Sequence, residues 1–180
     1  MACYGNSVIK TPNLNLLAEE SFVFENAYVS QPICTPSRST LMTGLYPHAT
    51  GCVRNNLPLD QDVETIAELA PSGYLTAYYG KWHLGDEVKR QRGFDEWLSC
   101  EDQYRKYYTE DSLLEDLSDY HHYLVKKGYV PDLEDMGEQT FSREFAAKLP
   151  IEDSRAMYLA NRASDFISTN KDRPFMMCVG

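Results

Sequence analysis

The chain has 180 residues, of which 43% are hydrophobic, so it can build the core of one ordinary domain or a large part of a bigger one. Its formal net charge of −10 argues against nucleic acid and anionic membranes as partners, because both select basic surfaces. A small anionic substrate is still compatible, since a cleft can carry a local potential opposite to that of the whole molecule. No apolar run approaches the roughly 18 residues of a membrane span, and none of the cysteines forms the C-x-x-C pair of zinc ribbons or thioredoxin-like sites.

Helices and strands are predicted along the N-terminal half. Thr11-Pro12 predicts the start of a helix, with threonine as the N-cap and proline in the first helical position. Residues 21–29, S-F-V-F-E-N-A-Y-V, favour a strand, and residues 62–70, D-V-E-T-I-A-E-L-A, have the apolar spacing of a helix. A short β-rich run, Y-L-T-A-Y-Y, follows at residues 74–79.

The C-terminal half begins with a change of composition. Residues 101–137 are rich in acidic residues and tyrosine, and we interpret them as a surface insertion that is helical in part, an aromatic cleft lining being the alternative. Within this segment the adjacent His121 and His122 diverge on a helix, so we interpret them as ordinary surface residues rather than a metal pair. Four leucines are expected on one helical face: Leu113, Leu114, Leu117 and Leu124.

The last elements complete an α/β pattern. Residues 152–170 are the clearest helix, because apolar residues recur at i, i+3, i+4 and i+7. F-M-M-C-V-G at residues 175–180 predicts a buried strand. Helices that alternate with short apolar strands indicate an α/β fold with a mostly parallel sheet flanked by helices.

The stretch C-T-P-S-R-S-T-L-M-T-G, residues 34–44, carries the clearest chemical signal. Pro36 suits the first position of a helix, with Thr35 as its N-cap and Gly44 as its end. This predicts about two turns of helix with Cys34 just before the N-terminus, where free N–H groups and the helix dipole favour an anion. Arg38 lies one turn into that helix, so its guanidinium can clamp a tetrahedral anion.

From these residues alone, several roles of Cys34 stay open. It can be a thiolate nucleophile, or a modified cysteine in an anion-binding turn. It can also be an inert, buried cysteine beside a capped helix, which is a common environment for a free cysteine.

A second stretch, G-Y-L-T-A-Y-Y-G-K-W-H-L-G at residues 73–85, places a lysine and a histidine directly after the β-rich run. If this backbone is extended, Lys81 and His83 project to one side and Trp82 to the other. An ammonium and an imidazole would then converge on one anionic group, Lys81 as a point charge and His83 as a proton or hydrogen-bond donor. Without further context, such a pair is also typical of a solvated strand end.

Both stretches resemble the two signature motifs of the sulfatase family, in the order in which that family has them. C-T-P-S-R-S-T-L-M-T-G-L-Y-P-H is similar to the first, C-x-P-S-R followed by a small-residue helix, T-G and Y-P-H. The G-K-W-H of the second stretch is similar to the second motif. The resemblance covers most of the chain and implies an alkaline-phosphatase-like domain, of which residues 1–180 are an N-terminal part without the first strand and the C-terminal half.

The resemblance implies hydrolysis of a sulfate monoester, on a sulfated small molecule or a sulfated glycan. In that family the cysteine matching Cys34 becomes formylglycine through a maturase or formylglycine-generating enzyme that reads the segment Cys34–Arg38. One hydroxyl of the hydrated aldehyde attacks sulfur, and the other then expels sulfate. Arg38 would hold this diol, while Lys81 and His83 would bind the sulfate and its leaving oxygen.

A divalent cation, Ca²⁺ or Mg²⁺, is also implied by the resemblance, as a Lewis acid that activates the nucleophile. Of its expected ligands only the modified Cys34 lies in this chain, whereas a hard cation takes about six oxygen ligands. We therefore expect most ligands outside residues 1–180, and little or no activity from these residues alone.

Three alternatives to a sulfatase stay open. The chain can belong to a phosphonate or phosphate ester hydrolase of the same superfamily that uses the same modified cysteine. It can be a cysteine phosphatase, which the C-x-x-x-R spacing disfavours, or an inactive, truncated sulfatase-like remnant. For the whole protein we expect the periplasm, the lysosome or the extracellular space rather than the cytoplasm.

Overall fold

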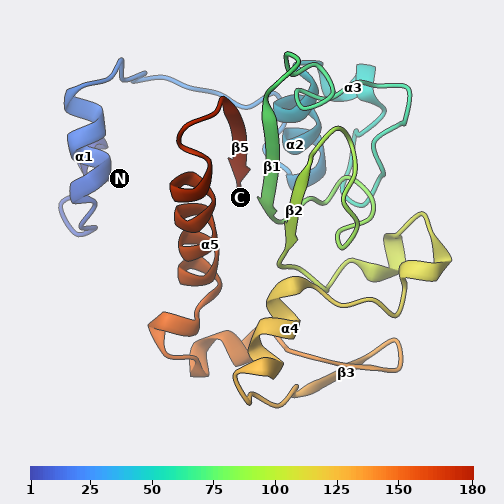
Figure 1. Ribbon diagram of the computed structural model, residues 1–180. Helices are drawn as coiled ribbons and strands as arrows, with labels where there is room; N and C mark the ends of the chain where they lie inside the picture. Colours follow the sequence, from blue (N-terminus) through green and yellow to red (C-terminus); the bar gives the residue numbers. More distant parts are fainter.

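The computed structural model describes residues 1–180, and its main element is a parallel sheet of three strands in the order β2-β1-β5 (Figure 1). In the register of this sheet, Tyr78 of the central strand pairs with Trp97 on one side and with Cys178 on the other. The strands are β1 (Leu75–Gly80), β2 (Glu96–Ser99) and β5 (Phe175–Val179). The predicted α/β fold with a parallel sheet is confirmed, and both predicted strands at residues 74–79 and 175–180 are present.

Helices cover both faces of this sheet, with α2 on one side and α5 on the other (Figure 1). The segment between β2 and α5 lies beyond the carboxyl ends of the strands, and it contains α4 and the antiparallel pair β3 (Leu133–Asp135) and β4 (Glu138–Thr140). The α-helices are α1 (Pro12–Glu19), α2 (Cys34–Thr43), α3 (Pro47–Thr50), α4 (Asp119–Lys126) and α5 (Arg155–Asn170). Short 3₁₀ helices span Ala2–Tyr4, Arg105–Tyr107, Asp111–Leu113, Glu144–Lys148 and Ile151–Asp153. None of the helices combines the length and apolar character needed to cross a bilayer.

Two hydrophobic clusters form the core, one on each face of the sheet, because successive side chains of β1 point to opposite faces. Tyr78 belongs to the cluster that includes Met42 of α2. Its neighbours Ala77 and Tyr79 belong to the other cluster, which includes Phe166 of α5. A strand that is buried on both faces in this way is typical of a parallel sheet covered by helices.

The strand predicted at residues 21–29 is absent, so this prediction is wrong. Phe22, Phe24 and Tyr28 are exposed, and no strand lies beside them to take their backbone hydrogen bonds. A β-rich run becomes a strand only when a neighbour pairs its N–H and C=O groups, so side-chain alternation was not sufficient.

The helix predicted at residues 62–70 is also wrong, since these residues form turns. The backbone N–H of Thr65 donates to the Glu68 carboxylate over 2.7 Å, and the Thr65 hydroxyl donates to the Arg92 carbonyl over 2.9 Å. The N–H of Ile66 donates to the carbonyl of Met42 in α2 over 2.7 Å. The local side-chain bond to Glu68 and the two bonds to the distant Arg92 and Met42 replace the helical hydrogen bonds that the apolar spacing predicted.

Other helix predictions are confirmed with shifts at their ends. Thr11 is the N-cap of α1 and Pro12 its first residue, as expected. The helix predicted from residue 152 begins at Arg155 instead, because the Ser154 side chain accepts a bond from the Met157 N–H and fixes the N-terminus there.

The segment 101–137 is helical only in part, and its helix α4 contributes to the core. Tyr120 and Leu124 are buried members of the cluster beside β1. Leu113 lies in a short 3₁₀ helix and Leu124 in α4, so the four leucines expected on one helical face do not share one. His121, which we interpreted as a surface residue, is 4% exposed, because α4 turns this side toward the core.

Candidate active site

Helix α2 begins at Cys34 itself, which is exposed at the N-terminus of the helix. The predicted N-cap at Thr35 is wrong: Ile33, in an extended conformation, takes that position. Thr35 is buried and bonds to distant residues, since its Oγ1 donates to the His83 carbonyl over 2.9 Å and accepts from the Asn56 N–H over 3.2 Å. Local capping rules therefore misplaced the helix start by two residues.

The end of α2 agrees with the sequence prediction. Gly44 lies at the C-terminus of the helix with a φ of 71°, in the left-handed region that favours glycine. Its N–H donates to the carbonyl of Thr40 over 2.8 Å, which satisfies one of the last carbonyl groups of the helix.

Arg38 connects α2 to the end of the central strand. Its Nη1 donates to the Lys81 carbonyl over 2.5 Å and to the Tyr78 hydroxyl over 3.0 Å. The Tyr78 hydroxyl in turn donates to the same Lys81 carbonyl. Burial raises the pKa of Tyr78 well above its ordinary value, so this phenol stays protonated as a donor. The guanidinium thereby lies beside the loop that carries Lys81.

Lys81 and His83 face the same side of this loop, where both contact Tyr104. The Lys81 Nζ lies 3.0 Å from the Tyr104 hydroxyl and 4.5 Å from the centre of its ring. The His83 ring stacks on the Tyr104 ring with centroids 3.9 Å apart. Trp82 points the other way, into the core cluster, where it is fully buried. The expected division of side chains is present.

The backbone at His83 is not extended as expected, because its φ is 57°. A non-glycine residue in a sparsely populated region of this kind costs on the order of 1–3 kcal/mol and needs support from its surroundings. That support comes from the fully buried Glu87, whose two oxygens accept the N–H groups of Trp82, over 2.7 Å, and of His83, over 2.6 Å. Burial raises the pKa of Glu87 to about 7, although both N–H bonds favour its ionised form.

The imidazole of His83 is buried and neutral near pH 7. Burial, followed by the nearby charges of Lys81 and Arg38, lowers the pKa of His83 to about 4. Its Nε2 lies 2.7 Å from the Asn56 Oδ1, and its Nδ1 has no protein partner. The tautomer with a proton on Nε2 satisfies the bond to Asn56 and leaves Nδ1 as an acceptor.

The segments that carry the predicted site residues therefore come together at the carboxyl end of β1. The helix that begins with Cys34 is bonded to the His83 loop through Thr35, and Arg38 is bonded to Lys81. This edge of a parallel sheet is where α/β proteins bind their ligands. Cys34 is exposed at a helix N-terminus, the Arg38 guanidinium is bonded to the loop after β1, and the Lys81 ammonium belongs to that loop. Groups of this kind suit a tetrahedral oxyanion.

Sequence reasoning missed three residues of this site: Asn56, Glu87 and Tyr104. None lies in either motif: Asn56 and Tyr104 reach the site through the tertiary fold, and Glu87 lies just after the second motif. Only the tyrosine-rich composition of residues 101–137 signalled that an aromatic side chain could line a cleft here.

The residues of this chain do not by themselves fit a divalent cation. No group of three or more His, Cys, Asp or Glu side chains is close enough together to hold a metal ion. A cation of the hard type needs several oxygen ligands, and Cys34 alone does not provide them.

Comparison with known proteins identifies the family. A family model described as Sulfatase matches residues 1–180. The chain belongs to the sulfatase family. This sulfatase chain is 32% identical over 180 residues to N-acetylglucosamine-6-O-sulfatase of Bacteroides thetaiotaomicron, which covers 98% of the chain and 26% of that protein. It is 44% identical over 94 residues to arylsulfatase A of Homo sapiens, which covers 47% of the chain and 18% of that protein.

Solved structures confirm the alkaline-phosphatase-like fold of this sulfatase. A protein solved in complex with its substrate D-glucosamine-2-N,6-O-disulfate matches 98% of the chain and 30% of its own, at 28% identity and a TM-score of 0.62. A phosphonate monoester hydrolase of Agrobacterium radiobacter matches 99% of the chain and 37% of its own, at 22% identity and a TM-score of 0.61, which shows a common fold only. The chain spans 24%, 26% and 34% of the lengths of three curated relatives.

Proposed function

We propose that the protein containing this chain is a sulfuric ester hydrolase that cleaves a sulfate monoester with a formylglycine nucleophile formed from Cys34. Two hydrogen bonds carry the proposal, because they join the two motifs into one site. They run from the Thr35 hydroxyl to the His83 carbonyl and from Arg38 to the Lys81 carbonyl. The sulfatase names of its relatives support the reaction class.

The first chemical step in this proposal forms an S–O bond. The hydrated aldehyde at position 34 has two hydroxyls, one of which attacks sulfur as the bond to the leaving oxygen breaks. The proton of the attacking hydroxyl goes to the leaving oxygen, so the products are an alcohol and a sulfated residue 34. In the second step the other hydroxyl loses its proton and the C=O bond reforms, which expels sulfate. Water then adds to the aldehyde and restores the diol.

Each basic side chain has a distinct role in this proposal. Lys81 is half-buried and adds a compact positive charge for the sulfate oxygens, while Arg38 holds the diol with the guanidinium nitrogens not bonded to Lys81. His83 is neutral near pH 7, so it takes part as a proton acceptor or hydrogen-bond partner of the diol or the leaving oxygen. Tyr104 orients Lys81 through a hydrogen bond and His83 through ring stacking.

A bound Ca²⁺ or Mg²⁺ remains a proposal for the whole protein. Such an ion supplies Lewis-acid stabilisation of sulfate oxygens when its ligands are present. Because the side chains of residues 1–180 form no group that fits it, no step above depends on the ion. We also propose that a maturase or formylglycine-generating enzyme acts on the segment Cys34–Arg38.

The substrate class that the relatives favour is a sulfated sugar. One relative is named for 6-O-desulfation of N-acetylglucosamine, another is called an ulvan-active sulfatase, and a solved neighbour holds a disulfated glucosamine. We therefore propose a sulfated glycan or a sulfated small sugar as the substrate.

Mass spectrometry and a matched activity assay test the proposal together. Conversion of Cys34 to formylglycine lowers the mass of its peptide by about 18 units, because sulfur and two hydrogens are replaced by one oxygen. In the whole protein produced with a maturase, we expect this mass and turnover of an aryl sulfate, both absent in Cys34→Ala. Active protein with an unmodified, alkylatable Cys34 would point to a thiolate instead. Faster turnover of the matching phosphate or phosphonate ester would assign the chain to the related hydrolases.

A further inference from the structure

The loop that follows α3 reaches the candidate active site through two adjacent asparagines, Asn55 and Asn56. The Asn55 Oδ1 accepts the backbone N–H of Thr35, in the first turn of α2, over 3.0 Å. The Asn56 Oδ1 lies 2.7 Å from the His83 Nε2, and the Asn56 N–H donates to the Thr35 Oγ1 over 3.2 Å. Neither asparagine belongs to the two motifs, and the proposed chemistry assigns them no role.

Thr35, His83 and Asn56 form a closed ring of hydrogen bonds. The Thr35 hydroxyl donates to the His83 carbonyl over 2.9 Å. A hydroxyl can also accept, and the Thr35 hydroxyl does so from the Asn56 N–H. The ring closes where the Asn56 Oδ1 faces the His83 imidazole. Because an amide oxygen can only accept, the proton of this last bond belongs to the His83 Nε2.

Both residues of this last bond have a left-handed backbone. The φ angle is 64° at Asn56 and 57° at His83, a region that only Arg92 and Met136 share among the other non-glycine residues of the chain. Such conformations cost on the order of 1–3 kcal/mol each and cluster at functional sites. Asparagine tolerates this region better than most residues, so position 56 suits asparagine through its backbone as well as its side chain.

The loop that carries Asn56 is anchored in the core at both ends. Cys52 and Leu59 are buried members of the cluster that includes Met42 of α2. The N–H of Leu59 also donates to the carbonyl of Leu84, the residue after His83, over 2.9 Å. Asn56 is therefore held against His83 by a loop whose two ends are fixed.

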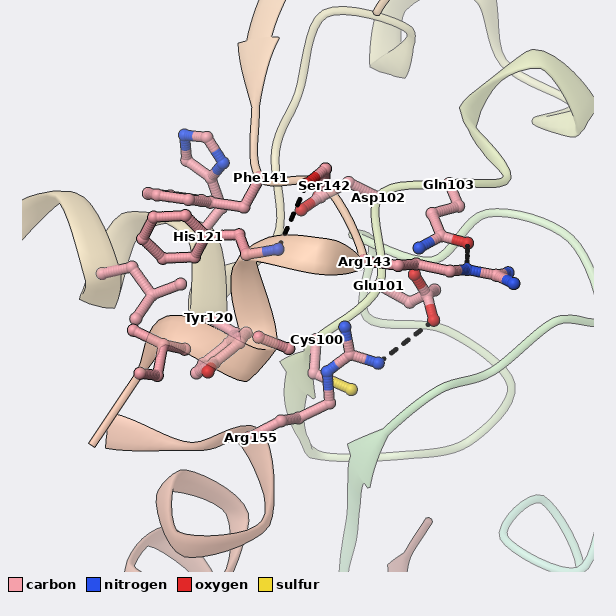
Figure 2. A pocket seen from close by; sticks show the side chains of 14 residues that line it. Cys100, Glu101, Asp102, Gln103, Tyr120, His121, Phe141, Ser142, Arg143 and Arg155 are labelled. Carbon is pink, nitrogen blue, oxygen red and sulfur yellow. Dashed lines mark hydrogen bonds and ion pairs between the residues drawn. The ribbon is translucent and has the colours of Figure 1, made fainter. Parts of the chain in front are cut away.

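The face of the His83 ring has a separate support, which does not depend on this loop. Tyr104 stacks on that face, and the residue before it, Gln103, accepts from the Arg143 Nε over 2.5 Å, as a dashed line in Figure 2 shows. Stacking fixes the plane of the imidazole but does not distinguish its two neutral tautomers. The tautomer is set by the hydrogen bond at the edge of the ring, which Asn56 supplies.

The other ring nitrogen of His83 has no partner in the chain. Its Nδ1 is buried without a hydrogen bond, although buried polar atoms are normally paired. With the proton on Nε2, the Nδ1 carries a lone pair and can accept one hydrogen bond.

We propose that Asn56 is a positioning residue, which keeps the proton of His83 on Nε2 and thereby reserves Nδ1 as a hydrogen-bond acceptor for the reaction. The catalytic consequence rests on the proposed function. Without the Asn56 oxygen, no bond to the ring selects between the tautomers, and the form with a proton on Nδ1 cannot accept there. Asn55 differs in that its bond goes to α2 and not to the imidazole.

Nitrogen-15 NMR of the whole protein, labelled at histidine, measures the tautomer, because a protonated and a bare ring nitrogen have well-separated chemical shifts. The signals of His83 are identified by their absence in His83→Asn. In the wild type we expect a protonated Nε2 and a bare Nδ1. Asn56→Gly suits the left-handed backbone and keeps the N–H bond to Thr35 while it removes Oδ1. In this variant both nitrogens should shift toward values averaged between the two tautomers.

Two further variants separate control of the tautomer from stability of the loop. Asn55→Ala removes the bond to the Thr35 N–H and should leave the His83 shifts unchanged. Asn56→Asp keeps an acceptor oxygen at Nε2 and should keep the wild-type tautomer at mildly alkaline pH, where the imidazole is neutral. On an aryl sulfate, Asn56→Gly should lower kcat about tenfold. Asn56→Asp should retain kcat and raise KM, because its carboxylate repels the sulfate.

A wild-type His83 with its proton on Nδ1 would overturn the assignment, as would unchanged His83 shifts in Asn56→Gly or an equal change in Asn55→Ala. If the glycine variant does not fold, Asn56→Asp decides the point, since a proton on Nδ1 in that variant would also contradict the assignment. The NMR measurement needs no turnover. A matured wild type that hydrolyses no sulfate ester would therefore contradict the proposed function alone.

Discussion

Tyr104 stacks on His83 with ring centroids 3.9 Å apart, and the same phenol hydroxyl lies 3.0 Å from the Lys81 Nζ. One side chain from the acidic, tyrosine-rich segment thus fixes the two polar groups of the second motif. Through Tyr104 this segment contributes to the candidate site.

Substitutions at Tyr104 should separate these two contacts. Tyr104→Phe keeps the stacked ring and loses the hydroxyl, so we expect a threefold to tenfold lower kcat/KM on an aryl sulfate, on the order of 1 kcal/mol for one hydrogen bond. Tyr104→Ala loses both contacts and should lower it by about a hundredfold. Tyr107, an exposed tyrosine of the same segment, supplies the control Tyr107→Phe, for which no change is expected. Wild-type rates in both Tyr104 variants would remove this residue from the site.

The hydrogen bond from the Thr35 hydroxyl to the His83 carbonyl should stabilise the packing of α2 against the loop after β1. Thr35→Val has nearly the same shape but leaves the buried His83 carbonyl and the Asn56 N–H without their partner. We expect the free energy of unfolding to fall by about 1–3 kcal/mol, measured by urea denaturation. Thr35→Ser retains the hydroxyl and should recover most of the loss. Equal stability of the valine variant and wild type would show that the bond contributes nothing.

Glu87 should make the stability depend on pH. Its pKa is about 7 in the folded chain and near 4.5 when unfolded, so the folded state holds the extra proton between these values. The contribution of Glu87 to the free energy of unfolding is therefore fully present below pH 4.5. It falls by up to about 3 kcal/mol as the pH rises toward 7. His83 has the opposite trend between pH 4 and 6.5, because its folded pKa is lowered.

The variant Glu87→Gln isolates the contribution of Glu87. Gln has no titrating proton, so the difference in unfolding free energy between variant and wild type should change with pH across pH 4.5–7. His83 is present in both proteins and cancels in this difference. Gln also offers only one acceptor oxygen to the two N–H groups, so a lower kcat is expected at every pH. A pH-independent difference in stability would contradict the raised pKa.

Helix α4 should contribute to global stability. Leu124 is 1% exposed in the core cluster beside β1, so Leu124→Ala should lower the free energy of unfolding by about 2–5 kcal/mol. Its neighbour Val125 is 46% exposed, and Val125→Ala should change stability by less than about 0.5 kcal/mol. A small effect at Leu124 would mean that residues 101–137 fold as an independent attachment.

Metal dependence should distinguish the whole protein from these 180 residues. We expect a chelator to abolish aryl sulfate turnover by the whole protein, and added Ca²⁺ or Mg²⁺ to restore it. Residues 1–180 alone should bind Ca²⁺ only weakly and show no turnover, because their side chains form no cation site. Tight binding of Ca²⁺ by residues 1–180 in calorimetry would contradict this expectation.

Apolar spacing and β-rich composition were sufficient to predict one helix and two strands of the fold. The apolar spacing of α5 and the β-rich runs of β1 and β5 predicted elements that the structure contains. The same kind of signal failed at residues 62–70, where the Thr65 side chain and the Ile66 N–H bond to residues distant in the chain. Periodicity reports which side chains can be buried, but not which backbone partners compete for the same N–H groups.

The candidate site shows the same limit. The two motifs contain Cys34, Arg38, Lys81 and His83, whose roles stay predictions, and the structure brings their segments together. Tyr104 and Asn56 reach His83 from distant parts of the chain. Glu87 lies only four residues after His83, but no motif marks it among the many acidic residues of the chain. Even Thr35, within the first motif, was assigned to a cap because its distant partner at His83 is not visible in local spacing.

The burial of Thr35 and Pro36 has a consequence for the biogenesis of the protein. The enzyme that we propose to modify Cys34 would need access to these two side chains, which the folded molecule encloses. On that proposal, modification would have to precede the packing of α2 against the sheet. The fraction of modified molecules would then depend on the rate of modification relative to the rate of folding.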